Sequence, residues 1–479
     1  MRMPSAGDVQ ALNDFMDREV PKPLLGLVYG RRRIGKSTLL VQETRKRRGL
    51  YYEAARVDTG MQLQRLGAAI GAHLDVGPLH MRGWEDAVDR LLRLAADRPL
   101  PVVLDEFGHI IEADPSVASL IASALGPGEG RERSARLVLC GSAIALMQSL
   151  TAGQAALRGR AGLELVMWAD DYRMAATRLG ADIDLDLAAR VFAVIGGVVG
   201  YATDMVAFDL PDGPSDFDRW VTQRILSPAA TLHHEASTLL AEDPTLAGGS
   251  QLHHHSILNA IGNGAGTAGD IAKRVGKPVP NLAPALNRLV ATGFVVRHED
   301  PIRARRPLYR LGDPYLQFSY ALLEPNRALL RDRPVTEIWQ DQMANTFHSQ
   351  VRGPVFEEQA RAFVRRHAAP STIGGQAFHV GPSAVVRGGV AYEVDVIVAG
   401  EGSLPADRPI TAIGEAKAGQ QMDVHHLRRL RELRASLGAR AVEARLLLFA
   451  NSFDAELSSA ARTAGDVELI DHQRLYHGF

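Results

Sequence analysis

The chain has 479 residues and is 46% hydrophobic, so its length predicts several domains with separate cores. A formal net charge of −1 excludes a global attraction to polyanions, and any nucleic-acid surface would have to be local. The single cysteine, Cys140, excludes an internal disulfide, and no signal peptide or membrane span is expected, which predicts a soluble cytoplasmic protein.

A phosphate-binding loop is predicted near the N-terminus. The apolar run LLGLVYGR predicts a strand that ends at Gly30, and RRRIGKSTLLVQETRKR predicts a following helix. The spacing G-x-x-x-x-G-K-[ST] lets backbone N–H groups approach phosphates, and the helix N-terminus adds positive charge. Lys36 is expected to reach the β- and γ-phosphates of ATP, and Ser37 to bind Mg²⁺. The predicted nucleotide-binding residues of the loop are Gly30, Arg31, Arg32, Arg33, Ile34, Gly35, Lys36, Ser37 and Thr38.

Two later strands end in residues that can complete this site. The segment LPVVLDEFGHI predicts a strand that delivers Asp105 to the metal shell and Glu106 to the attacking water as general base. ARLVLCGSAIALM predicts a strand that ends near Ser142, which either contacts the γ-phosphate side or is an ordinary turn residue. Cys140 lies among apolar residues and is expected to be a buried filler.

The middle of the chain reads as helical. LDLAARVFAVI and FDRWVTQRILS have apolar residues at helical spacing, and DPTLAGGS, residues 243–250, is the best linker candidate. The next segment predicts three helices and a two-stranded wing, the pattern of a winged helix. In its third helix, Pro284 is expected within the first turn after a capping Asn281.

Basic residues outnumber acidic ones in this winged-helix segment. Local positive charge suits phosphate contact, so DNA binding is one interpretation and an internal lid or packing role is the other. The histidines at 233–234 and 253–255 have no Cys or carboxylate at ligand spacing, and no metal site is expected there. The basic residues are Lys273, Arg274, Lys277, Arg288, Arg297, Arg303, Arg305, Arg306 and Arg310.

From about residue 345 a further α/β domain is predicted. The helix PVFEEQARAFVRRHA precedes two or more strands, the helix DVHHLRRLRELRASLG, the strand ARLLLFA, another helix and the strand VELID. Alternation along YEVDVIVAG places Asp395 on one face and its neighbours Val394 and Val396 on the other.

The next strand, ITAIGEAKAG, carries two more charged residues. Glu415 and Lys417 share a face while Ala416 points to the core. Two strands can therefore bring Asp395, Glu415 and Lys417 to one point. Burying these charged groups costs free energy, so their placement favours a functional role. A salt bridge of Lys417 between the two acids is the alternative interpretation.

The motifs occur in a familiar order. YGRRRIGKSTLL, LDEF, LCGSAIALM, ALRGRAGLELVMWADDY and GGVVGY resemble the archaeal-type ATPases, a branch of the AAA+/STAND P-loop enzymes, over nearly the whole chain. Val199 stands where that family usually has proline. The resemblance implies an ATPase core with a lid, and a possible homo-oligomer. Arg158 or Arg160 could then neutralise transition-state charge, either within its own chain or from a neighbouring subunit. The alternative is that these are ordinary solvated arginines.

The C-terminal segment resembles the PD-(D/E)xK nuclease superfamily and the nuclease-like domain fused to such ATPases. This resemblance implies that Asp395 and Glu415 bind Mg²⁺ and that Lys417 orients or activates the attacking water. It makes Glu357 the fourth member, although the adjoining Glu358 could be the inward residue.

These inferences predict a multidomain α/β protein. The expected domains are a P-loop AAA+-type ATPase core (1–170), a helical lid (171–248), a winged helix (249–315), a connector (316–344) and a restriction-endonuclease-like α/β domain (345–479). The expected function is ATP binding and hydrolysis coupled to nucleic acid, first of all DNA, with nucleotide state governing access to a Mg²⁺-dependent nuclease site. The alternative is a STAND-type regulatory switch whose inactive nuclease fold serves only for binding. The predicted catalytic residues are Lys36, Glu106, Asp395, Glu415 and Lys417, and the predicted metal ligands are Ser37, Asp105, Glu357, Asp395 and Glu415.

Overall fold

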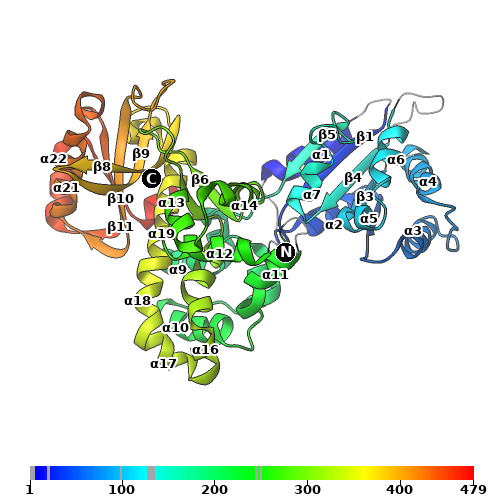
Figure 1. Cartoon of the computed structure of the whole chain (residues 1–479), viewed down its shortest axis with the longest axis horizontal. Coiled ribbons are helices and arrows are strands. Elements are labelled where there is room, and N and C mark those ends of the chain that lie inside the picture. Colours follow the sequence, from blue (N-terminus) through cyan, green and yellow to red (C-terminus); the bar gives the residue numbers. More distant parts are fainter. Residues whose placement is uncertain are drawn as a thin grey trace. The chain divides into compact units, whose positions relative to one another are not determined.

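The computed structural model describes residues 6–18, 22–97, 100–126, 135–180, 182–242, 246 and 251–478. The chain divides into two compact units (Figure 1). The first comprises Met1–Ala169, Val198–Gly200 and Thr238–Gly249, and the second comprises Asp170–Gly197, Tyr201–Ser237 and Ser250–Phe479. None of the helices in the described ranges combines the length and apolarity that crossing a bilayer requires.

The first unit is built on a parallel sheet in the order β2-β3-β4-β1-β5. Its strands are β1 (Leu24–Tyr29), β2 (Leu50–Glu53), β3 (Pro101–Asp105), β4 (Arg136–Gly141) and β5 (Ala161–Val166). β1, β3 and β4 are buried along their whole length, as expected of parallel strands covered on both faces. The strands predicted to end at Gly30, at Asp105 and near Ser142 are thereby confirmed.

Helices flank this sheet and follow its strands. They are α1 (Ala6–Asp17), α2 (Lys36–Lys46), α3 (Thr59–His73), α4 (Trp84–Asp97), α5 (Phe107–Ala113), α6 (Val117–Ala124) and α7 (Ile144–Ser149). α3 starts where the Asp58 carboxylate accepts the N–H of Met61, which satisfies a donor that has no partner within the helix. Leu27, Leu104 and Leu139 from the three central strands lie in the core of this unit.

The second unit opens with helices α8 (Tyr172–Leu179) and α9 (Leu185–Ile195). Asp171 and Asp184 cap their N-termini by accepting the N–H groups of Met174 and Leu187. Further helices are α10 (Phe217–Val221) and the π-helical η3 (Thr222–Leu226), followed by α11 (Glu235–Glu242), which crosses from the second unit into the first at Thr238. The predicted helical character of this segment is confirmed. The predicted linker, residues 243–250, lies outside the described residues except for Leu246, and so does the domain boundary placed within it.

The segment predicted as a winged helix holds three helices and two strands in the expected order. They are α12 (Gln251–Gly262), α13 (Ala268–Val275), α14 (Val279–Ala291), β6 (Val295–His298) and β7 (Leu308–Leu311), with the strands antiparallel. The prediction for Pro284 is wrong, because α14 begins at Val279 after Pro278 and Pro284 lies inside it. Pro280 occupies the first turn, where proline is tolerated. The helix can therefore begin two residues before Asn281, the predicted cap.

Six α-helices lead to a second sheet. They are α15 (Pro314–Phe318), α16 (Glu324–Asp332), α17 (Val335–Ile338), α18 (Ala344–Thr346), α19 (Gly353–Arg366) and α20 (Pro370–Ile373). Its order is β12-β11-β10-β9-β8. The strands are β8 (His379–Arg387), β9 (Val390–Ala399), β10 (Ile410–Met422), β11 (Arg445–Phe453) and β12 (Val467–Ile470). α21 (Val424–Ser436) and α22 (Ala455–Ala464) share one core with this sheet, whereas α19 and α23 (His472–His477) share the other.

Candidate functional site

The loop after β1 has the backbone that a phosphate-binding loop requires. Gly30 has φ 155° and Gly35 has φ 98°, both in the range that favours glycine. A Cβ atom on Gly30 would lie 2.1 Å from the carbonyl oxygen of Met167, so no larger residue fits there. Gly35 immediately precedes Lys36, the first residue of α2. The first N–H groups of this helix lack partners within it, and together with its dipole they favour an anion.

Lys36 is held at the centre of the loop. Its side chain is buried, and Nζ donates a hydrogen bond to the carbonyl of Arg31 at 2.9 Å. Burial lowers the pKa of the Lys36 amine, while Cys140, Glu106 and Asp105 act in the opposite direction. The ammonium group therefore lies at the same edge of the sheet as the two acids at the end of β3.

Asp105 ends β3 as a buried carboxylate. It accepts the O–H of Tyr51 at 2.5 Å and the backbone N–H of Glu106 at 2.8 Å. Burial alone would raise the pKa of Asp105, but hydrogen bonds from Cys140, Tyr51 and Ser37 outweigh it and hold the pKa below its ordinary value. An ionised carboxylate beside a serine hydroxyl suits Mg²⁺, which prefers oxygen ligands, so these two residues fit the predicted metal.

Glu106 adopts a left-handed backbone with φ 49° and ψ 44°. This conformation costs a residue with a side chain about 1–2 kcal/mol, and such strain is often found at functional sites. The Ser142 hydroxyl donates to Glu106 Oε2 at 3.0 Å, which links the ends of β3 and β4. Because β4 lies between β1 and β3, the structure brings the loop around Lys36, Ser142, Glu106 and Asp105 to one edge.

No signal in the sequence indicates Tyr51 as a site residue. Its contact with Asp105 depends on the pairing of β2 with β3, and nothing local in the sequence indicates that pairing. The two candidate charge-neutralising arginines, Arg158 and Arg160, are exposed, and Arg158 donates to the carbonyl of Gly153 at 2.5 Å.

In the second sheet, β9 is interrupted by a bulge at the predicted acid. Two residues, Asp395 and Val396, stand opposite the single residue Pro382 of β8. Proline supplies no N–H for the ladder, and a bulge shifts the alternation of the side chains that follow. Val394 consequently packs into the core shared with α21 and Val396 into the core shared with α19, so the prediction that they share a face is wrong.

Glu357 on α19 approaches the bulged residue. Asp395 Oδ2 accepts the N–H of Ala416 at 2.8 Å, which fixes it against β10. Burial, reinforced by the charge of Asp395, raises the pKa of Glu357 to about 7. Arg361, which was not among the predicted site residues, donates to the carbonyl of Asp395 at 2.8 Å and lies 3.7 Å from Glu357. Glu357 is thus the residue that faces Asp395, while Glu358 pairs with Arg361 at 2.9 Å.

Glu415 is paired with two cations. Lys417 Nζ lies 3.2 Å and Arg429 Nη1 3.4 Å from its Oε1 atom, so the salt-bridge interpretation of Lys417 holds for this acid. No group of three or more His, Cys, Asp or Glu side chains within the described part of the chain is placed to hold a metal ion. Glu357, Asp395 and Glu415 thus do not form such a group in the described structure, although Asp395 lies near enough for the charge of Glu415 to raise its pKa. Lys417 and Arg429 both engage the third carboxylate.

The connection between β6 and β7 packs against α19 and the second sheet. His298 Nε2 lies 3.0 Å from Oε2 of Glu358, and the Ser383 hydroxyl donates to Asp300 Oδ2 at 2.9 Å. Ile302 belongs to the core shared with α21. This side of the β6–β7 pair is therefore an internal contact of the second unit.

The predicted nucleic-acid-binding residues differ in exposure. Arg297 is exposed but pairs with Glu299, whereas Arg303 and Arg310 are half-buried. Arg310 lies near Glu357, because its positive charge opposes the rise that burial causes in the pKa of that carboxyl group. The exposed members are Lys273, Arg274, Lys277, Arg288, Arg305 and Arg306.

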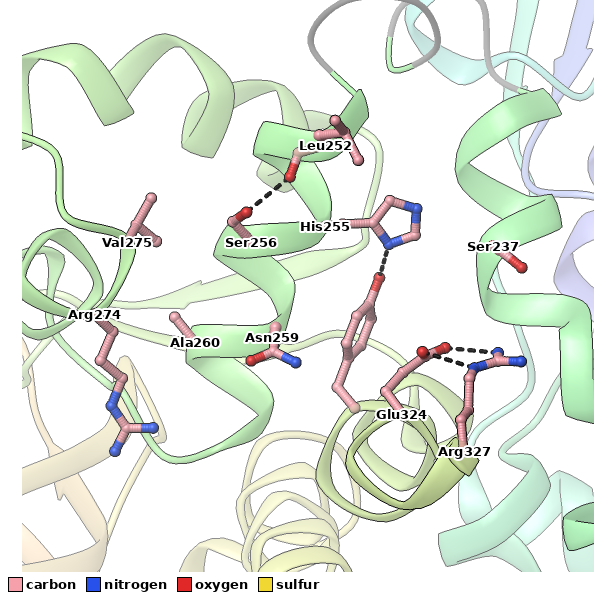
Figure 2. Close-up of a pocket in the computed structure, with 11 residues that line it drawn as sticks. Ser237, Leu252, His255, Ser256, Asn259, Ala260, Arg274, Val275, Glu324 and Arg327 are labelled. Carbon is pink, nitrogen blue, oxygen red and sulfur yellow. Dashed lines mark hydrogen bonds and ion pairs between the residues drawn. The ribbon is translucent and has the colours of Figure 1, made fainter. Parts of the chain in front are cut away.

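A cavity of about 980 Å³ lies in the second unit, lined mainly by α12, α13 and the helices around Tyr320 (Figure 2). His255 Nδ1 is 2.7 Å from the hydroxyl of Tyr320, and Arg327 pairs with Glu324 at 2.7 Å. The polar groups at its centre satisfy one another, so the cavity shows no set of side chains converging on a ligand.

Comparison with known proteins gives remote likenesses. No family model matches the sequence. The chain is 22% identical over 366 residues to the uncharacterized protein MJECL04 of Methanocaldococcus jannaschii, covering 74% of this chain and 76% of that protein. It is similar to the Walker-type ATPase PABY2304 of Pyrococcus abyssi, with a TM-score of 0.48 and 17% identity over 66% of this chain and 95% of that chain. It is also similar to the ORC2 protein of Aeropyrum pernix in its ADPNP-ADP complexes, with a TM-score of 0.43 and 17% identity over 72% and 95% of the two chains. At such distances the chemistry of each site has to come from its own residues.

Proposed function

We propose that the first unit binds ATP and hydrolyses it at the carboxyl edge of β1, β4 and β3. The observation that carries this proposal is the convergence of Lys36, Asp105, Glu106 and Ser142 from three strands around a loop that only glycine can form at Gly30. A chance glycine-rich turn would not place a strained acid and a buried lysine at the same edge.

The residues divide the chemistry among them. The N–H groups after Gly35 would receive the phosphates, and Lys36 would exchange the Arg31 carbonyl for phosphate oxygens. Ser37 and Asp105 would hold Mg²⁺, which when bound neutralises charge on the phosphates. Glu106 would accept a proton from the attacking water, and the Ser142 hydroxyl would orient its carboxylate.

Calorimetric titration with ATP tests this assignment. Lys36→Ala should abolish binding, and Glu106→Gln should retain binding but lose turnover. Lys46→Ala is a matched control, because this lysine ends the same helix but is exposed. Wild-type affinity in Lys36→Ala would overturn the assignment.

We further infer that the second unit engages nucleic acid through α13 and α14. Lys277 and Arg288 both lie near His253. Burial lowers the pKa of His253, and the positive charges of these two residues lower it further. In filter binding, Lys277→Glu with Arg288→Glu should weaken DNA binding and flatten its salt dependence by about two phosphate contacts. Two exposed arginines elsewhere, changed together as Arg331→Glu and Arg462→Glu, control for net charge. Equal salt slopes for the two double variants would favour the internal lid role.

A second candidate function concerns the C-terminal domain. Glu357 and Asp395 are half-buried and Asp395 lies near Lys417, which favours the predicted phosphodiesterase with access governed by ATP. Glu415 is paired with a cation, which favours the regulatory switch, in which this domain serves only for binding. As they stand, these residues do not fit a three-carboxylate metal centre.

Cleavage assays decide between these two functions. The purified chain, Asp395→Ala and the matched control Asp407→Ala, an exposed acid of the same domain, would be incubated with DNA and RNA substrates, Mg²⁺ or Mn²⁺, with and without ATP. Cleavage lost only in Asp395→Ala supports the phosphodiesterase, and no cleavage by any of the three supports the switch.

A further inference from the structure

One aromatic side chain beside the loop is conspicuously exposed. Three of the four tryptophans, Trp84, Trp220 and Trp339, are no more than 4% exposed, whereas Trp168 is 54% exposed. An exposed indole leaves a large apolar ring in water, and tryptophan is enriched at surfaces where a partner binds.

The backbone places Trp168 next to the start of the phosphate-binding loop. The N–H of Met167 donates to the carbonyl of Tyr29 at 2.8 Å, so the pairing of β5 with β1 extends past the end of β5. The carbonyl of Met167 then abuts Gly30, where a Cβ atom would lie 2.1 Å away. The following residue, Trp168, is therefore fixed at the carboxyl edge of the sheet beside Gly30.

The strand order sets the direction in which a nucleotide lies. Glu106 and Ser142, the groups assigned to the γ-phosphate side, follow β3 and β4. β4 pairs with one side of β1 and β5 with the other (Figure 1). Trp168 follows β5 in the chain and therefore lies across β1 from Glu106 and Ser142. A nucleoside triphosphate is a chain from base to γ-phosphate. With its phosphates at the N-terminus of α2 and its γ-phosphate toward β3 and β4, its base end would lie on the β5 side.

We propose that the indole of Trp168 is the platform on which the base of the bound nucleotide stacks. This inference rests on the proposed ATP site and assigns its base-binding part. Stacking uses the face of the base and not its hydrogen-bonding edge, so the platform accepts adenine and guanine alike. Removing the ring should weaken ATP and GTP binding by similar factors, roughly tenfold each.

The test compares nucleotides with a ligand that has no base. Dissociation constants of ATP, GTP and inorganic tripolyphosphate would be measured by calorimetry for the full chain, Trp168→Ala and Trp168→Phe. Trp168→Ala should bind ATP and GTP roughly tenfold more weakly but tripolyphosphate as the wild type does, and Trp168→Phe should recover most of the loss. Phe208→Ala, another exposed aromatic residue in the second unit, is the matched control and should change nothing.

The outcomes separate this inference from the proposed function. Unchanged ATP affinity in Trp168→Ala overturns the platform and leaves the ATP site standing. An equal loss for tripolyphosphate and ATP also overturns it, because the variant has then damaged the loop itself. A wild-type chain that binds tripolyphosphate as tightly as ATP refutes the platform alone, and one that binds neither refutes the ATP site together with it.

Discussion

Replacing Asp186 should destabilise the second unit strongly. Asp186 lies in the first turn of α9, and its carboxylate contacts Arg190 at 2.5 Å, Arg352 of the π-helical η8 (Phe347–Arg352) and Asn451 of β11. These contacts join α9 to η8 and to the second sheet. Asp186→Ala would leave Arg352, only 4% exposed, buried without its carboxylate, and the charge of Arg190 would then act on it unopposed.

The size and pH dependence of the loss follow from this geometry. Removing one partner of a buried ion pair costs about 3–5 kcal/mol. Burial alone would raise the pKa of Asp186, but Arg352 and Arg190 hold it below its ordinary value. A depressed carboxyl pKa contributes stability above the unfolded pKa of about 3.9, which is lost as pH falls through the folded pKa. The difference from the wild type should be constant between about pH 5 and 8 and should shrink below about pH 4.

Urea unfolding followed by tryptophan fluorescence measures this loss. In a background with Trp84→Phe and Trp168→Phe, the remaining tryptophans, Trp220 and Trp339, both report on the second unit. Asp182→Ala, an exposed acid ahead of the same helix, is the control.

A double variant separates the buried charge from other effects of the substitution. Adding Arg352→Met to Asp186→Ala should restore part of the stability, because no unpaired buried charge then remains. Two results would refute the reasoning. One is a free energy of unfolding for Asp186→Ala within about 0.5 kcal/mol of the wild type, and the other is a double variant whose loss of stability equals the summed losses of Asp186→Ala and Arg352→Met measured separately.

Three further predictions concern the two sites. Tyr51→Phe removes a hydrogen bond that lowers the pKa of Asp105, so the acid limb of the ATPase pH–rate profile should move to higher pH, and an unmoved limb would contradict this role. Glu357 has a raised pKa of about 7, so the folded state binds its proton more tightly and loses stability as pH rises from about 4.5 to 7. Glu357→Gln should therefore stabilise the second unit at pH 8 by on the order of 2 kcal/mol and have little effect at pH 4, as measured by urea unfolding. Gly30→Ala places a Cβ atom 2.1 Å from the Met167 carbonyl and should abolish ATP binding, whereas Gly159→Ala, at another left-handed glycine with open space around it, should bind ATP normally in calorimetry.

The sequence by itself determined the features that are local in the chain. The loop from Gly30 to Ser37 and the strand ending at Asp105 are readable because their meaning lies in spacing, apolar runs and glycine within a dozen residues. The helices of the second unit and the β9–β10 pair that carries Asp395 and Glu415 were predicted on the same basis.

Only the tertiary structure decided which distant side chains meet. Tyr51 reaches Asp105 through strand pairing, and Arg361 reaches the carbonyl of Asp395 from a helix 34 residues earlier in the sequence. The bulge opposite Pro382 depends on the register of β8 against β9, and a shift of register moves every later side chain to the other face. The pairing of Glu415 with Arg429 likewise depends on how α21 packs on the sheet, because a charge pattern in the sequence does not state which cation will neutralise which acid.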